Sequence, residues 1–260
     1  YSPDGQPGRR PDRATVVYCQ RAREAYKGVP IIAGGVEASM RRIAHYDYWS
    51  DKVRRSILLD AKADLLVYGM GERTLLEIVR RLAAGQSLPE LRNLRGVAYR
   101  LGASQSIPKW QEEPARPLFS TAARDGGDGR LLGGSVAAAS AAGDVILPSV
   151  EEVAADKTAF VEMTRLAQLH TNPYCTRRLV QYHGREAVIV NPPALPLTES
   201  ELDWIHELPF TRQAHPSYAP RRIPALEVVK NSVQILRGCF GGCAFCSLAA
   251  HQGRVIQSRS

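Results

Sequence analysis

Three cysteines near the end of the sequence constrain this chain more than any other feature. Cys239, Cys243 and Cys246 form a C-x3-C-x2-C pattern. Three thiolates at this spacing can hold three irons of a [4Fe–4S] cluster and leave the fourth iron without a protein ligand. An open metal position is what a chelating substrate requires, whereas a purely structural metal site is closed. The pattern therefore predicts that these three cysteines are the metal ligands of a cluster with one open iron.

Three other interpretations of the cysteines stay open at this point. A zinc knuckle would need a fourth ligand, for which His251 is the nearest candidate. A ferredoxin-type cluster would usually have a fourth cysteine close by, and no cysteine follows Cys246. Structural thiols at the end of an apolar strand are the third alternative. Against it, Gly238, Gly241 and Gly242 favour a backbone that wraps a cluster closely.

The segment from Arg237 to Cys246 resembles the radical S-adenosylmethionine (SAM) signature. In that signature the amino and carboxylate groups of SAM fill the open iron site, and an aromatic residue precedes the last cysteine, as Phe245 does here. The resemblance implies that Phe245 belongs to the cofactor-binding loop. It also implies reductive cleavage of SAM to methionine and a 5′-deoxyadenosyl radical, with a reductant such as a flavodoxin or ferredoxin as partner. It identifies neither the catalytic residues nor the substrate.

The first hundred residues alternate between helix and strand patterns separated by short turns. Helices are expected at 12–27, 51–63 and 73–84, and strands at 29–33, 64–68 and 97–100. This alternation is typical of an α/β fold with a doubly wound, Rossmann-like parallel sheet. Later, capping boxes at Ser149 and Thr198 predict helices reaching about Thr171 and His206, and residues 185–190 read as a strand.

The composition divides the chain into four predicted segments. Residues 1–113 are a partial N-terminal α/β domain, and residues 114–148 are a Gly/Ala/Ser-rich flexible linker or insertion. Residues 149–228 are a connecting α/β segment. Residues 229–260 contain an apolar strand that leads into the cysteine loop, which is the pattern expected of the first strand of an incomplete radical SAM (β/α) partial barrel.

Two glycine pairs follow neighbouring predicted strands of the first segment. By themselves, Gly34-Gly35 and Gly69-Met70-Gly71 favour tight turns over a phosphate site. Their order resembles the later half of a cobalamin-binding domain, which implies a corrinoid between them. However, the family's ligand histidine has no counterpart before His45, and the second motif is retained only in part, up to Glu72. The resemblance therefore leaves cobalamin and a corrinoid-free relative as alternatives.

Taken together, the chain resembles YgiQ-type radical SAM proteins. The stretches that carry the resemblance are 11–18, 34–39, 41–49, 171–175, 191–196 and 237–260, nearly the whole chain apart from the Gly/Ala-rich segment. The resemblance implies a [4Fe–4S] cluster and SAM chemistry. After the cysteines, Arg259 could face the SAM carboxylate or cap a helix, and the sequence does not decide between the two.

Charge and the remaining cysteines bear on the alternatives. A net charge of +8 allows RNA as a partner, although the arginines come as scattered pairs without an aromatic stacking platform. The alternative function is thus a non-catalytic iron–sulfur or RNA-binding protein with a structural cluster. Cys19 and Cys175 are too scattered to suggest a disulfide and are not expected to bind the cluster.

Size and surroundings complete the expectations. The sequence begins with Tyr1 and ends at Ser260, soon after the last cysteine, so we interpret it as a fragment cut at both ends. The fragment alone is expected not to turn over SAM. The remaining contacts to SAM would come from later strands of a barrel, which needs more residues than follow Cys246 here. A labile cluster implies a reducing, cytoplasmic setting, and no apolar run approaches the length that spans a membrane.

Overall fold

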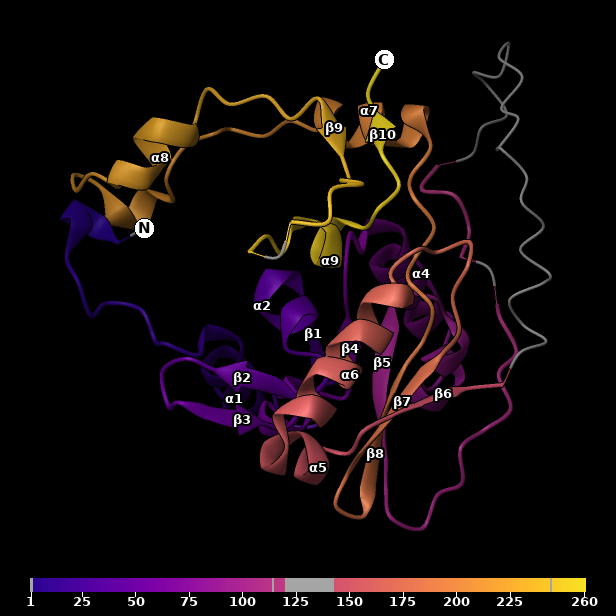
Figure 1. Ribbon diagram of the computed structural model, residues 1–260. Helices are drawn as coiled ribbons and strands as arrows, with labels where there is room; N and C mark the ends of the chain where they lie inside the picture. Colours follow the sequence, from indigo (N-terminus) through magenta and orange to yellow (C-terminus); the bar gives the residue numbers. More distant parts are fainter. Residues whose placement is uncertain (1, 114, 120–142, 244) are drawn as a thin grey trace.

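A six-stranded sheet forms the centre of the computed structural model, which describes residues 2–113, 115–119, 143–243 and 245–260 (Figure 1). In spatial order the strands are β1 (Ile32–Ala33), β4 (Leu65–Val67), β5 (Val97–Leu101), β8 (Glu186–Val190), β7 (Leu179–His183) and β6 (Val145–Leu147). Helices cover the sheet, so the predicted α/β class is confirmed.

The strand directions are mixed, which corrects the expectation of a parallel sheet. The pairs β1–β4 and β6–β7 are parallel, whereas β4–β5, β5–β8 and β7–β8 are antiparallel. The sequence analysis missed β7, which runs into β8 through a tight turn at Gly184, where φ is +62°. A connection this short can join only antiparallel neighbours, and a parallel neighbour would need a long crossover.

The predicted segment boundaries do not divide this sheet. β5 belongs to segment 1–113, yet its neighbour β8 belongs to segment 149–228. Residues 145–147, which were expected in the linker, form the edge strand β6. The described strands therefore join both predicted segments in one sheet. Most of the predicted linker, residues 114 and 120–142, lies outside the described residues.

Each face of the sheet has its own hydrophobic core. Successive side chains of a strand point to opposite faces, so Leu66 and Ala98 enter one core while Leu65 and Val97 enter the other. Burying one such side chain fully contributes roughly 1.5–3 kcal/mol. The first face packs against α1 (Ala14–Ala25), α2 (Gly35–Met40), α3 (Ile57–Asp60), α5 (Val150–Ala155) and α6 (Lys157–Leu169), and the second against α4 (Glu72–Ala83) and the 3-10 helix η2 (Leu88–Asn93).

The helix expected at 51–63 is wrong in its first half. A hairpin of β2 (His45–Asp47) and β3 (Lys52–Arg54) precedes the short helix α3. Ser50 caps no helix, because its hydroxyl donates to the buried Asp47 carboxylate at 2.5 Å. Arg13 Nη2 binds the same carboxylate at 2.5 Å, and Ser56 is the residue that caps α3. Burial would raise the pKa of Asp47, but these hydrogen bonds outweigh it and lower the pKa to about 2.

The capping boxes place the later helices correctly. Both the Ser149 box and the Thr198 box are formed, at the starts of α5 and of α7 (Glu199–Glu207). The helix expected to reach Thr171 is interrupted at Asp156, whose carboxylate accepts from the Thr158 amide and starts α6. A second N-cap side chain therefore splits a pattern that reads as one helix in the sequence.

The last part of the chain forms small elements outside the main sheet. They are the 3-10 helix η4 (Pro216–Tyr218), α8 (Pro224–Val229), β9 (Leu236–Arg237), α9 (Leu248–Gln252) and β10 (Gln257–Ser258). β9 pairs with β10 in antiparallel register, so the first strand of a (β/α) barrel remains a prediction. The N-terminal 3-10 helix η1 (Pro3–Gly5) lies beside α8, where the Asp4 amide donates to the Arg222 carbonyl at 2.7 Å (Figure 1).

Among the helices that the structure describes, none has both the length and the apolar character needed to cross a membrane.

A buried histidine should make the stability of this fold depend on pH. Both ring nitrogens of His183 are buried without a hydrogen-bond partner, and burial lowers the pKa of His183 from 6.5 to about 4. Because the native pKa is depressed, the neutral form is favoured on folding. That stability is present above about pH 6.5 and is lost as the pH falls toward 4.

We expect His183→Leu to reduce this loss of stability by about 3 kcal/mol, because leucine has no proton to gain. The measurement is the free energy of urea unfolding between pH 7 and pH 4. His215→Leu, at an exposed ring, is the matched control and should keep the wild-type slope. Equal slopes in the wild type and the His183→Leu variant would contradict the assignment.

Candidate functional site

The cysteine loop leaves β9 and returns through α9 to β10, and backbone hydrogen bonds close it at its base. The Cys239 amide donates to the Gly253 carbonyl at 3.1 Å, and the Gly238 amide donates to the Gln252 side-chain oxygen at 3.1 Å. Farther along, the Cys246 amide donates to the Cys243 carbonyl at 3.1 Å. The first cysteine is therefore fixed to the end of α9, while the other two lie on the outer part of the loop.

Gly238 is required by the base of the loop. Its φ is +85°, and a Cβ atom there would lie 2.0 Å from the carbonyl oxygen of Val255. The position therefore excludes a side chain both by conformation and by space. Gly242 is the opposite case, since a Cβ atom there would meet nothing within 4 Å.

Two of the three cysteine sulfurs converge over a bare glycine. A Cβ atom at Gly241 would lie 3.3 Å from Cys239 Sγ and 3.8 Å from Cys243 Sγ, and the Gly241 amide donates to Cys239 Sγ at 3.4 Å. Free thiols over backbone amides, without a side chain between them, fit the donor set of an iron–sulfur cluster.

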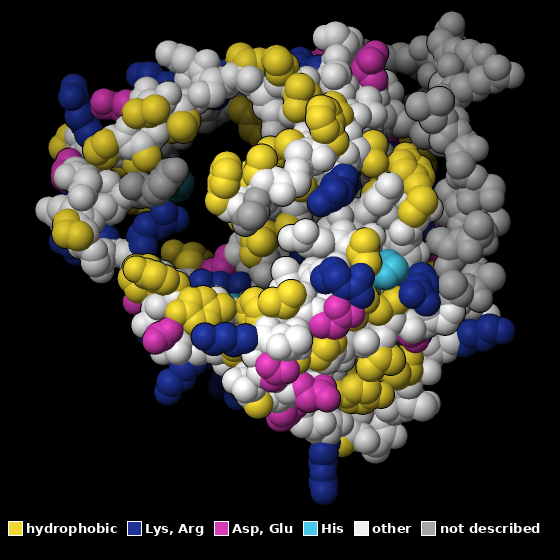
Figure 2. All heavy atoms as spheres, in the orientation of Figure 1, with side chains coloured by type: hydrophobic (Ala, Val, Ile, Leu, Met, Phe, Trp, Pro, Cys, Tyr) yellow, Lys and Arg dark blue, Asp and Glu magenta, His cyan; other side chains and the backbone are white. Residues whose placement is uncertain are grey.

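The third cysteine is not gathered with the other two. Cys246 and Cys243 are exposed, and the described part of the chain contains no group of three or more His, Cys, Asp or Glu side chains placed to hold a metal. Phe245 is 93% exposed, and Figure 2 shows hydrophobic side chains gathered at the surface around this loop. His251, the candidate zinc ligand, forms no such group with the cysteines either. Cys19 is buried in α1 and Cys175 precedes β7, so both lie on other elements.

An ion pair connects the loop to the main sheet. Arg237, the residue before Gly238, places Nη1 2.6 Å from Glu72 Oε1. Glu72 is the first residue of α4 and directly follows Gly71, where a Cβ atom would lie 2.5 Å from Val67 Cγ1. The turn after β4 therefore positions a carboxylate against the root of the cysteine loop. Sequence reasoning noted Glu72 as part of a motif but did not find its partner.

The glycine turns do lie side by side, as predicted, because β1 and β4 are parallel neighbours. Their role is close packing of backbones. A Cβ atom at Gly34 would lie 3.4 Å from the Val67 carbonyl, and one at Gly69 would lie 3.3 Å from the His251 carbonyl of α9. The short helix after the cysteines, α9, thus covers the end of the sheet where β4 terminates, which we call the sheet edge.

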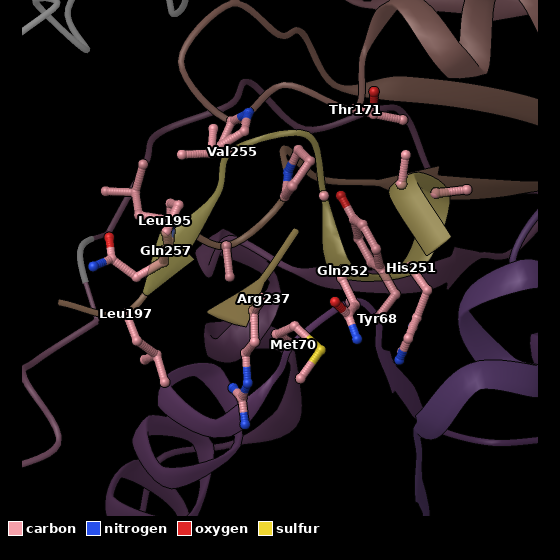
Figure 3. Close-up of a pocket in the computed structure, with 18 of the residues that line it drawn as sticks. Tyr68, Met70, Thr171, Leu195, Leu197, Arg237, His251, Gln252, Val255 and Gln257 are labelled. Carbon is pink, nitrogen blue, oxygen red and sulfur yellow. The ribbon is translucent and has the colours of Figure 1, made fainter. Parts of the chain in front are cut away.

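A cavity of about 60 Å³ remains between α9 and the sheet edge (Figure 3). Its wall combines several parts of the chain. They include the turn after α2, the end of β4, the loop after α6, the connector after β8 (residues 193–197), α7, β9 and the segment after the cysteines. The residues that line the cavity include Arg42, Tyr68, Ala194, Leu195, Arg237 and His251.

The cavity that the structure describes at this edge does not accommodate a corrinoid, and the cobalamin expectation stays a prediction. α9 covers the edge at which the resemblance places cobalamin, and a cavity of about 60 Å³ is far below the roughly 300 Å³ at which small-molecule pockets begin. Arg259 Nε lies 3.5 Å from Asp203 Oδ1 of α7, and both roles expected for Arg259, facing SAM or capping a helix, stay predictions.

A family model described as radical SAM N-terminal matches residues 1–232. The chain belongs to the radical SAM N-terminal family. The match ends before Cys239, so it covers the sheet and the connector but not the cysteine loop.

Relatives extend the similarity over the cysteine loop. A UPF0313 protein of Rhodopseudomonas palustris is 50% identical over 263 residues, which cover 100% of this chain and 36% of the relative. The UPF0313 protein YgiQ of Escherichia coli is 44% identical over 283 residues, covering 100% of this chain and 38% of YgiQ. The predicted YgiQ-like family is thereby confirmed. The chain spans little more than a third of these relatives, and no solved structure matches it.

The loop glycines give a graded test of the site. We expect Gly238→Ala to destabilise the loop by more than about 1 kcal/mol, because alanine must adopt a positive φ and displace the Val255 carbonyl. Gly242→Ala should leave the loop intact. Hydrogen exchange of the Cys239 amide measures the difference, since this amide bonds to Gly253. Equal protection in both variants would show that Gly238 does not set the loop's shape.

Proposed function

We propose that this chain is the N-terminal part of a radical SAM enzyme and that Cys239, Cys243 and Cys246 hold its [4Fe–4S] cluster. The observation that carries the proposal is the convergence of Cys239 and Cys243 sulfurs over Gly241, in a loop that β9 and α9 anchor. Family membership supports it independently. When bound, such a cluster supplies the electron that cleaves SAM to methionine and a 5′-deoxyadenosyl radical.

The residues of this chain position the loop for that chemistry. The Gly253 carbonyl fixes the Cys239 amide, and Glu72 holds Arg237 at the root of the loop. Cys246 is carried on the exposed outer part and is proposed to join the other two sulfurs when the cluster is bound. Phe245, one residue before it, is proposed to lie against SAM. The partners proposed are SAM and a flavodoxin- or ferredoxin-type reductant, in the cytoplasm.

The alternative of RNA binding is weakened by the arginine pairs that suggested it. Arg54 and Arg55 both bind Asp60, at 2.7 Å each, and Arg81 Nε binds Glu77 at 2.7 Å. A guanidinium engaged by a carboxylate must give up that partner before it can bind a phosphate. These arginines therefore stabilise the fold, and no described observation favours a nucleic-acid surface over them.

Cysteine substitution in a full-length relative with this loop tests the cluster. We expect each of Cys239→Ala, Cys243→Ala and Cys246→Ala to lose the visible charge-transfer absorbance and most of the bound iron after anaerobic reconstitution, because three ligands are the minimum for the cluster. Formation of 5′-deoxyadenosine from SAM with dithionite should fall to background in the same variants.

Cys19→Ala and Cys175→Ala are the matched controls, and both should keep the wild-type iron content. Full cluster content in the Cys243→Ala variant would contradict the assignment of the three cysteines as cluster ligands. If the wild type binds a normal cluster but forms no 5′-deoxyadenosine, the cluster assignment would stand and the proposed radical chemistry would be rejected. The same assay on the 260-residue chain tests the expectation that it does not turn over SAM by itself.

A further inference from the structure

Arg42 carries a buried charge without a carboxylate partner. The residue is 8% exposed, and its guanidinium lies 4.6 Å from the centre of the Tyr68 ring. Nη1 donates to the Ser39 carbonyl at 2.5 Å, while Nε is buried without a hydrogen-bond partner. Among the described residues no acidic side chain forms an ion pair with Arg42. An unpaired buried charge is costly, and proteins rarely keep one without a use.

This charged side chain lines the cavity between α9 and the sheet edge. Arg42 forms part of the wall, together with His251, whose Nδ1 is also buried without a partner. The second arginine of the wall, Arg237, is already neutralised by Glu72. The Tyr68 hydroxyl is also engaged, because it donates to the Asn191 carbonyl. Arg237 Nη1 is also buried without a hydrogen-bond partner, but the Glu72 carboxylate neutralises its charge. Of the two arginines on the described wall, Arg42 is therefore the one whose charge no carboxylate neutralises.

We propose that this cavity binds the carboxylate group of a small molecule and that Arg42 is its anchor. With Nη1 engaged by Ser39, the Nε and Nη2 edge of the guanidinium is left, and that edge pairs side-on with a planar carboxylate. One unneutralised cation suits a monoanion better than a phosphate dianion. Ala194 and Leu195 line the same cavity and suit a short aliphatic tail. At about 60 Å³ the space accommodates only a few non-hydrogen atoms.

The carboxylate could belong to SAM or to a separate metabolite, because α9 follows directly after the cysteine loop. The binding site itself does not depend on SAM cleavage. Its test therefore needs neither the cluster nor turnover, and it can fail or succeed independently of the proposed function.

The experiment titrates propionate into the 260-residue chain at constant ionic strength, with chloride as the replaced anion. The amide resonances of Gly69 and Gln252, on the two sides of the cavity, report binding. Propionamide, which has nearly the same shape without the charge, is the ligand control. The variants are Arg42→Met and Arg42→Lys. The matched control is Arg100→Met, which removes an exposed arginine paired with Glu186 on the sheet.

We expect saturable shifts with propionate, none with propionamide, and a loss of affinity of at least roughly tenfold in both Arg42 variants. Arg100→Met should bind as the wild type does. If Arg42→Met does not fold by circular dichroism, Arg42→Lys decides, since it keeps the charge and loses the side-on edge. Competition by SAM would assign the site to the SAM carboxylate, and lack of competition would assign it to a separate metabolite. Both results support a carboxylate site.

Three results would overturn the proposal. The first is an absence of saturable propionate binding. The second is unchanged affinity in a folded Arg42 variant, which would separate the binding from this residue. The third is an equal response to inorganic phosphate, which would reject the carboxylate in favour of a general anion effect.

Discussion

The described structure depends on one close approach between two backbones. The turn after β4 has no side chain at Gly69, so the carbonyl of His251 in α9 can lie directly against it. Two residues beyond that turn, Gly71 leads into α4, whose first residue Glu72 holds Arg237 at 2.6 Å. A short helix with little buried surface of its own could not hold a cysteine loop in place. Because packing and an ion pair attach this segment to the sheet edge, α9 can hold the cysteine loop in place.

Local signals in the sequence predicted the longest helices and four strands of the central sheet, β1, β4, β5 and β8. They did not predict which distant elements pair. The capping boxes at Ser149 and Thr198 predicted the helix starts because a cap is decided within four residues. The strand at 179–183 was missed, although its antiparallel partner β8 was predicted at 185–190. Its parallel neighbour β6 was missed as well, because residues 145–147 fell in the predicted linker. The second strand of the hairpin, β3, was read as the start of a helix because the hairpin is stabilised by Arg13, far away in the sequence. Long-range ion pairs decide such segments, and spacing alone does not reveal them.

The site shows the same division. The cysteine spacing and the glycines that the loop needs are local, so they were readable in the sequence, and Gly238 and Gly241 each have a structural reason. Arg237 was recognised only as the start of a motif. Its partner Glu72 precedes it by more than half of the chain. The two residues meet only because the cysteine segment packs against the end of β4, where α4 begins. The sequence did not indicate that Arg42 is buried, because a pair such as Arg41-Arg42 normally indicates a solvated face.

The wall of the cavity joins the sheet edge, the connector and the cysteine segment into one physical unit. Arg42 and Tyr68 come from the sheet side, Ala194 and Leu195 from the connector, and His251 from α9. An occupant that neutralises Arg42 would lie in a cavity that α9 also lines, and α9 is the helix whose C-cap, Gly253, fixes the Cys239 amide. Because a ligand stabilises only the state that it binds, occupancy of the cavity would favour the docked position of α9 over an undocked one. A reaction that begins at the cysteine loop would in this way be coupled to the presence of a bound carboxylate.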